Sequence, residues 1–135
     1  MRKNEESSED ILAKIEARRY AIGYVYQMIV TNDSAENVLL QHQEGMHKFT
    51  SIVCNGVNDN LAVITKEIES KLNNKWPLNR LNFIDRAILF VATYELMFTD
   101  LSRIIIISAA VDLAKTYCDD DRYKFINGVL DNVGK

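Results

Sequence analysis

The sequence predicts a single all-α domain of six or seven helices, and three observations lead to that fold class. Hydrophobic residues recur every three or four positions along most of the 135 residues, which is the period of an α-helix. Only five glycines and one proline are available to interrupt such helices. The four isoleucines at 104–107 have high strand propensity on their own. We nevertheless predict a helix there, because Val111 and Ala114 continue the helical spacing and no second strand is present to pair with the block.

The first third of the chain is predicted to contain two helices. Residues 1–9 are polar and are expected to be disordered, followed by a helix over 10–30 that Ser8 or Asp10 could cap. A run of short polar side chains then ends this helix, and a brief second helix is expected over 35–43.

The middle of the chain is predicted to contain one long helix and then the central helix of the fold. The long helix covers residues 49–73 and ends before Pro77, which disfavours helical backbone in the residue that precedes it. The central helix covers residues 80–98. It is apolar nearly all round, as expected of a helix that is buried against several neighbours.

Two further helices are predicted in the last third. The first covers residues 101–118, with Asp100 or Ser102 as its cap, and three consecutive aspartates follow it. The last helix covers residues 125–133. Gly128 lies inside it, where glycine is unfavourable, so we expect a close backbone approach to a neighbour at that position.

Asp85 and Glu95 interrupt the apolar seam of the central helix. An unpaired carboxylate in such a seam is costly, so each needs a partner. For Asp85 the candidates are Arg80, Arg86 or another molecule, whereas Glu95 is expected to accept hydrogen bonds from free N–H groups of a neighbouring helix. Ten residues of helix separate the two carboxylates by about 15 Å. That distance argues against a catalytic acid–base pair.

No motif for catalysis, metal binding or a cofactor is present in the sequence. Cys54 and Cys118 are not spaced as metal ligands, and His42 and His47 are five residues apart, which does not place them on one helical face. No glycine-rich phosphate-binding motif and no nucleophile motif occurs. We therefore expect no enzyme activity, no cofactor and no metal.

The composition is that of an ordinary globular protein. The chain is 47% hydrophobic and 26% charged, and its net charge of -3 argues against binding nucleic acid over its whole surface. The longest aliphatic block is too short to cross a membrane, and the polar N-terminus is not a signal peptide. A cytoplasmic location is expected.

A local cationic patch is possible on the first helix. Lys14, Arg18 and Arg19 are neighbours there, and they could contact RNA phosphates or pair with acidic residues on a solvated face. Nearby tyrosines could stack on bases. Tyr26 belongs to the apolar stripe of the helix, so we expect it to be half-buried.

Three stretches of the chain resemble the NusB family of bacterial transcription antitermination factors. The first is ARRYAIGYVYQ at 17–27, similar to the family's basic first helix. The second contains IDRAIL at 84–89 and ATYEL at 92–96, and the third contains AVDLAK at 110–115 and KFINGVLD at 124–131. The resemblance runs from about residue 14 to the end, so residues 1–135 are expected to form one NusB-like RNA-binding domain.

The resemblance implies a fold of two small helical bundles and a non-enzymatic function. Members of the family pair with a small ribosomal protein, NusE, bind the boxA RNA of nascent ribosomal RNA transcripts, and help RNA polymerase resist termination. The resemblance also implies that Tyr26 and Asp85 face the protein partner. The residues that it places at the RNA are Lys14, Arg18, Arg19, Asp121, Lys124 and Phe125.

The chain also departs from the family pattern, which keeps two alternatives open. Ile15 and Glu16 interrupt what is usually a run of arginines, and fewer cations neutralise fewer phosphates. A helical protein–protein adaptor with weak RNA binding is one alternative. The RNA-recognition fragment of an RNA methyltransferase is another. The free protein could also form a homodimer, as some members of the family do.

Overall fold

The structure is a computed structural model in which residues 7–72 and 77–135 are described. These residues contain seven α-helices, one short 3-10 helix and no strand, which confirms the all-α prediction. Among them, no helix combines the length and the hydrophobicity needed to cross a bilayer. The elements are α1 (Ser8–Thr31), α2 (Ala35–Leu40), α3 (Lys48–Asp59), α4 (Leu61–Ser70), η1 (Leu78–Arg80), α5 (Phe83–Phe98), α6 (Arg103–Tyr117) and α7 (Arg122–Asn132).

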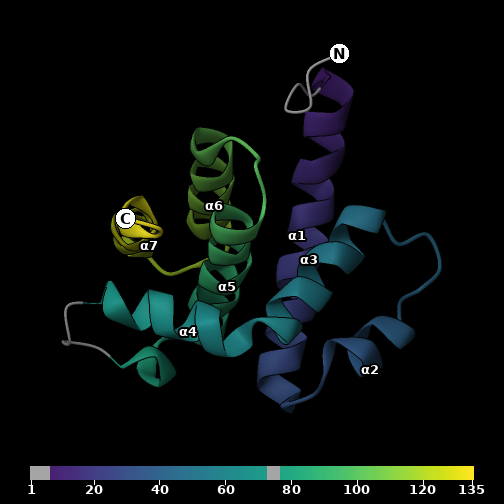
Figure 1. Cartoon of the computed structure of the whole chain (residues 1–135), viewed down its shortest axis with the longest axis horizontal. Coiled ribbons are helices and arrows are strands. Elements are labelled where there is room, and N and C mark those ends of the chain that lie inside the picture. The colour runs from purple at the N-terminus through teal and green to yellow at the C-terminus, as the bar shows by residue number, and fades with distance from the viewer. Residues whose placement is uncertain (1–6, 73–76) are drawn as a thin grey trace.

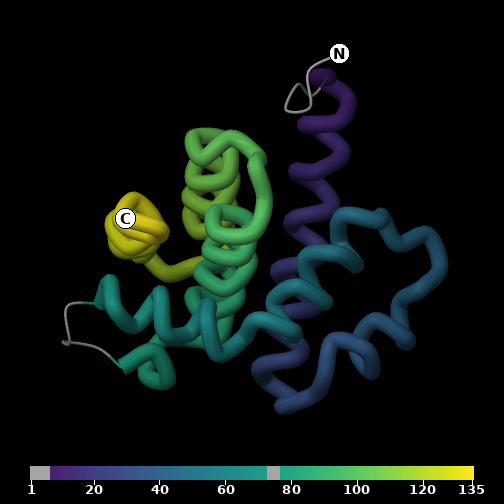
Figure 2. The backbone as a smooth tube through the Cα atoms, in the orientation of Figure 1, coloured from purple at the N-terminus to yellow at the C-terminus, as the bar shows by residue number. Residues whose placement is uncertain are grey.

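The helices form two bundles that share α5, as the family resemblance implied. One bundle consists of α1, α2 and α3, and the other of α4, α6 and α7 around α5 (Figure 1). Helix α5 also packs along α1 and α3, so it contacts both bundles. Figure 2 shows that the first helix, α1, and the last, α7, lie in different bundles. The protein therefore has one continuous core with α5 at its centre.

Helix α5 is the most deeply buried element. Every residue from 87 to 95 is buried, and this run includes Leu89 and Val91, which have no exposed surface. The helix begins at Phe83, three residues later than predicted, because the backbone after Pro77 first forms the 3-10 turn η1 and Asn82 is the N-cap. Burial on all sides makes α5 the scaffold that positions side chains from both bundles.

The long helix predicted over residues 49–73 is wrong, because the chain forms two helices that meet at Asn60. The backbone of Asn60 leaves the helical region (φ −116°, ψ 21°), and its side chain donates a 2.8 Å hydrogen bond to the carbonyl of Gly56. Asparagine competes with helical hydrogen bonding in this way. At this break the chain passes from the first bundle to the second, where α4 packs on α5.

The start of α1 also differs from the prediction. Ser7 is the cap, and its hydroxyl accepts a 3.1 Å hydrogen bond from the backbone N–H of Asp10. Ser8 and Glu9, which were expected to be disordered, are helical, and the acidic residues of this first turn favour a helix N-terminus. Residues 1–6 lie outside the described part of the chain. Ser34, the last of the short polar residues that end α1, caps α2, and Ser102, one of the two caps expected there, caps α6.

The close backbone approach expected at Gly128 occurs instead at Gly56. A Cβ on Gly128 would meet no heavy atom within 4 Å, whereas a Cβ on Gly56 would overlap the ring of Tyr94. Gly56 therefore allows α3 to pack directly against α5.

Candidate functional site

The three cations predicted to form a patch on α1 have different surroundings. The Nζ atom of Lys14 lies 5.6 Å from the centre of the Phe49 ring on α3. Arg18 is buried, with 2% of its surface exposed. Arg19 pairs with Glu16 one turn earlier on the same helix. Lys14, Arg18 and Arg19 therefore do not form one continuous cationic surface.

Arg18 forms a buried ion pair with Glu95. Its Nε and Nη2 atoms donate to the two carboxylate oxygens of Glu95, each at 2.7 Å, and Glu95 has no exposed surface. Such a two-point contact fixes both planar groups. The internal role expected for Glu95 is present, and the partner that the described residues show for it is the guanidinium of Arg18. Arg18 cannot reach a phosphate without breaking this pair, so its expected place at the RNA does not suit its geometry.

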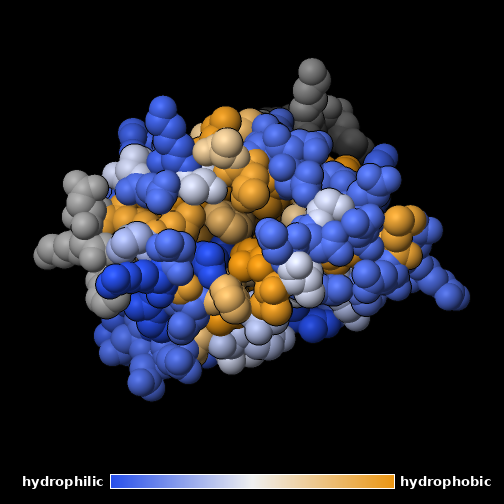
Figure 3. Space-filling model, turned by 90° about the horizontal axis from the view of Figure 1, so that it is seen from below, coloured by the Kyte–Doolittle hydropathy of each residue, from blue (hydrophilic) through white to orange (hydrophobic). Residues whose placement is uncertain are grey.

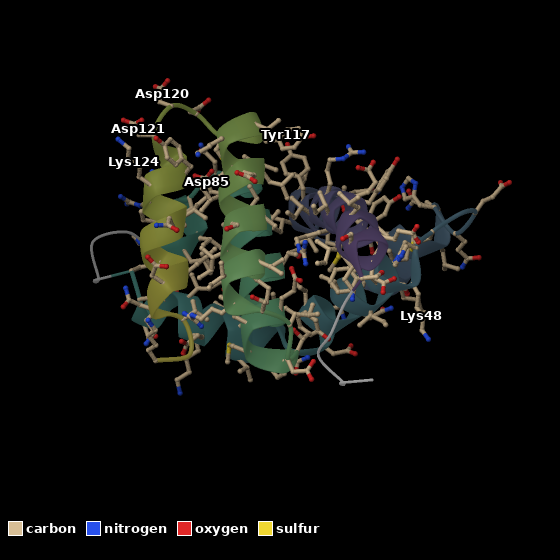
Figure 4. The ribbon with its side chains drawn as sticks, turned by 90° about the horizontal axis from the view of Figure 1, so that it is seen from above. Lys48, Asp85, Tyr117, Asp120, Asp121 and Lys124 are labelled. Atoms are coloured by element: carbon tan, nitrogen blue, oxygen red, sulfur yellow. The ribbon has the colours of Figure 1, made fainter. Side chains whose placement is uncertain are left out.

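Arg19 remains at the surface and is held by three contacts. It donates to Glu16, its guanidinium lies 4.8 Å from the centre of the Tyr20 ring, and the side chain of Tyr117 at the end of α6 lies beside it. The hydrogen bond with Glu16, and after it the neighbouring Tyr117, raise the pKa of Arg19. The same pair lowers the pKa of Glu16. In Figure 4, Tyr117 projects from α6 towards α1.

A row of aromatic rings extends from Arg19 along α1. The rings of Tyr20 and Tyr24 are stacked with centroids 6.2 Å apart, and Tyr24 stacks on His42 at 4.8 Å. The row lines a cavity of about 380 Å³. Tyr20 is 49% exposed, so a planar group could stack at that end of the row.

Asp85 is buried and pairs with the first residue of α7. Its carboxylate has no exposed surface and accepts a 2.8 Å hydrogen bond from Nε of Arg122. Of the described side chains, it is therefore Arg122 and not the expected Arg80 or Arg86 that pairs with it. Arg122 also stacks over the ring of Phe125, 4.5 Å from its centre. A direct contact between Asp85 and a partner, which the resemblance suggested, does not suit this burial. Asp85 instead orients the start of α7.

The thiols next to these helices are not nucleophiles. Burial, and secondly the neighbouring Asp85, raise the pKa of Cys118 to about 12. Burial alone raises the pKa of Cys54 to about 12. A thiol that stays protonated is a weak nucleophile and a weak metal ligand. In the described ranges, no three histidine, cysteine, aspartate or glutamate side chains are grouped to hold a metal ion.

The predicted RNA-facing residues of α7 lie together at one corner of the molecule. The side chains of Asp121 and Lys124 are 77% and 65% exposed, and Nζ of Lys124 is 3.9 Å from the carboxylate. Phe125 is half-buried beneath Arg122. Figure 4 shows Asp121 and Lys124 on the same side of the molecule as Tyr117, which contacts Arg19.

A second exposed cluster joins α1 to the start of α5. Tyr26 is 41% exposed, a little more than the half-buried position expected, and its ring meets that of Phe83 edge to face at 6.5 Å. Phe83 is 44% exposed, and Arg86 lies 4.7 Å from the centre of its ring. Sequence reasoning missed Phe83, Tyr117 and Arg122. An aromatic residue at the first position of an otherwise buried helix was the available signal for Phe83.

Comparison with known proteins agrees with this fold along nearly the whole chain. The family model described as "NusB family" matches residues 15–135. The transcription antitermination protein NusB of Bacillus thuringiensis is 36% identical over 123 residues, which cover 87% of this chain and 93% of the relative. The corresponding protein of Pediococcus pentosaceus is 40% identical over 92 residues, which cover 68% of this chain and 69% of the relative.

Solved structures give the same result. The structure of T. maritima NusB superposes with a TM-score of 0.77 at 31% identity and covers 88% of both chains. The solution structure of NusB from Aquifex aeolicus has a TM-score of 0.70 at 24% identity, covering 87% of this chain and 84% of that one, and supports the fold alone. The class is thus that of the all-helical, non-enzymatic factors of transcription antitermination. The chain belongs to the NusB family.

Proposed function

We propose that this protein binds the boxA RNA of nascent ribosomal RNA transcripts as a heterodimer with the small ribosomal protein NusE, within an RNA polymerase antitermination complex. Family membership supports the proposal, and the observation that carries it is the contact between Arg19 and Tyr117. This contact brings the basic side of α1 next to the end of α6, from which the Asp121–Lys124 corner follows. A cytoplasmic location follows from the same proposal, because nascent bacterial transcripts are made there.

The RNA-facing surface that we propose consists of Lys14, Arg19, Tyr20, Asp121, Lys124 and Phe125. Arg19 and Lys124 carry exposed positive charge for phosphates, and Tyr20 offers a ring on which a base can stack. Arg18 supports this surface from within, because its pair with Glu95 holds α1 against α5. The surface is small, which agrees with a chain whose net charge is -3.

The protein-facing surface that we propose is centred on Tyr26 and Phe83. Two exposed aromatic rings in contact, one from α1 and one from α5, are the kind of side chains that dominate binding energy at protein interfaces. Asp85 contributes instead to the RNA-facing surface, because it holds Arg122 at the start of α7, beside Asp121 and Lys124.

The test is binding of boxA RNA to the chain, with and without NusE, over a series of salt concentrations. Replacing Arg19 and Lys124 together by glutamine should weaken binding, and the slope of log K against log salt should fall by roughly 0.7 for each phosphate of single-stranded RNA that the protein no longer neutralises. Lys66→Gln is the matched control, since Lys66 is an exposed lysine on α4. Absence of sequence-selective binding with NusE present would rule out the proposal.

The burial of Arg18 also favours a second candidate, a protein–protein adaptor with weak RNA binding. It leaves fewer exposed cations on α1 than the sequence suggested. In that case NusE would bind the chain tightly, and boxA and scrambled RNA would bind the heterodimer equally weakly.

A further inference from the structure

A cavity of about 500 Å³ lies where the two bundles meet, and nothing in the established family assignment accounts for it. Its walls come from α1, α3, α4, η1 and α5, and most of them are apolar side chains such as Ile29, Leu61 and Phe90. This volume falls within the range of typical ligand sites. The face seen from below in Figure 3 carries an area of hydrophobic side chains bounded by hydrophilic ones.

Arg86 brings a positive charge to this apolar wall. Its Nε atom is buried and makes no hydrogen bond, and its guanidinium is held over the ring of Phe83 at 4.7 Å. No carboxylate among the described residues forms an ion pair with it. Burial lowers the pKa of Arg86 from its usual value, yet a guanidinium remains charged at any physiological pH.

Two other arginines show what Arg86 lacks. The Nε atom of Arg18 donates to Glu95 at 2.7 Å, and the Nε atom of Arg122 donates to Asp85 at 2.8 Å. Each of these arginines thus has a carboxylate partner on α5. A buried guanidinium N–H without a partner costs free energy that a carboxylate from outside could recover.

We propose that this cavity receives an aspartate or glutamate side chain, next to an apolar one, from the protein partner. The carboxylate would accept hydrogen bonds from Arg86, and the apolar side chain would fill the space beside Leu61. The inference rests on the proposed function in one respect, namely that the partner is NusE.

The charges around the cavity favour a polypeptide over RNA. Asp33 and Glu69 line the same cavity, so a chain of phosphates would be repelled, whereas a single carboxylate needs only the one guanidinium. Asn79 also lines it and is exposed, so its amide can pair with the main chain of a peptide.

The first test measures the affinity of NusE for variants of the full chain. Arg86→Gln should weaken binding at least tenfold, and Arg86→Lys should recover part of the loss. Arg80→Gln is the matched control, because Arg80 is exposed and lies outside the cavity, and it should change affinity less than twofold. Leu61→Glu places a negative charge at the exposed cavity wall, where it would repel the carboxylate of the partner. This variant should therefore also lose affinity for NusE, and it tests the inference if Arg86→Gln does not fold. Unchanged binding by folded Arg86→Gln and Leu61→Glu would overturn the inference.

The second test does not depend on NusE. The Nε–H signal of Arg86 is followed by NMR while the capped peptide Ala-Leu-Glu-Leu-Ala, its Gln analogue, inorganic phosphate or boxA RNA is added to the full chain. The inference expects a shift with the Glu peptide and none with the Gln peptide. A response to phosphate or RNA but not to the Glu peptide would overturn it. If the Arg86 signal shifts with the Glu peptide but the wild-type chain does not bind NusE, the carboxylate site is supported and NusE is rejected as the partner.

Discussion

Arg18 of α1 and Glu95 of α5 face each other through two 2.7 Å hydrogen bonds, although 77 residues separate them in the sequence. Both side chains are buried, and Arg18 also lies over the ring of Phe49, 5.4 Å from its centre. The pair therefore links the first bundle to the central helix, and with it the basic side of α1 to the rest of the fold. It also explains why a conspicuous arginine in a basic stretch is not at the surface.

Removing one member of this pair should destabilise the fold strongly. Glu95→Ala leaves the Arg18 guanidinium buried without its carboxylate, and we expect a loss of about 3–5 kcal/mol in the free energy of unfolding, measured in urea. Arg19→Ala removes exposed contacts, with Glu16, the Tyr20 ring and Tyr117, and should cost far less, because solvent screens exposed pairs. The double replacement Arg18→Met with Glu95→Leu should cost less than either single change. A similar loss for Glu95→Ala and Arg19→Ala would contradict this account of Arg18.

Two glycine substitutions should have opposite effects. Gly56→Ala puts a methyl group into the ring of Tyr94, so either this buried ring or the two helices must shift, and the protein should lose about 1–3 kcal/mol. Gly128→Ala adds a methyl group in open space on α7, where the better helix propensity should stabilise the protein by about 0.5–1 kcal/mol. Thermal or urea unfolding of both variants tests the prediction. If both substitutions stabilised the protein, or both destabilised it, the close contact between α3 at Gly56 and Tyr94 of α5 would be contradicted.

Asp85 should act through Arg122. Asp85→Asn and Arg122→Gln each break the same 2.8 Å pair, so the two single variants should weaken RNA binding to a similar degree and the double variant little further. A double-mutant cycle on RNA affinity, with unfolding measured in parallel, tests this coupling. If Asp85 instead touched the partner directly, Asp85→Asn would impair NusE binding while Arg122→Gln would not.

Stability should fall in alkaline solution, partly because of Cys54. Burial raises the pKa of its thiol from 9.0 to about 12, so between these values the unfolded chain releases a proton that the folded protein retains. The contribution of the Cys54 thiol to the free energy of unfolding is thus fully present below pH 9. It is lost as the pH rises towards 12, at a rate of at most about 1.4 kcal/mol per pH unit. Urea unfolding from pH 8 to 10.5 should show a smaller decline for Cys54→Ala than for the wild type. Parallel declines would mean that this thiol ionises as easily in the fold as outside it.

The sequence alone determined the helical elements and the family. Its three- and four-residue period predicted α1, α5 and α6 to within a few residues, and the local pattern narrowed the cap of α6 to Asp100 or Ser102. Such features depend on neighbours along the chain, so they can be read without knowing how the helices pack. Even the need for partners at Asp85 and Glu95 followed from polarity at apolar positions.

Only the tertiary structure decided which residues meet. The partners of Asp85 and Glu95, the burial of Arg18, and the approach of α3 to α5 at Gly56 all join segments that are distant in the sequence. The break at Asn60 belongs here too, since the chain turns there to reach the second bundle. The physical reason is that periodicity reports which face of a helix is buried. Which helix covers that face, and whether a charged group there finds a counter-charge, depend on the packing of the whole core.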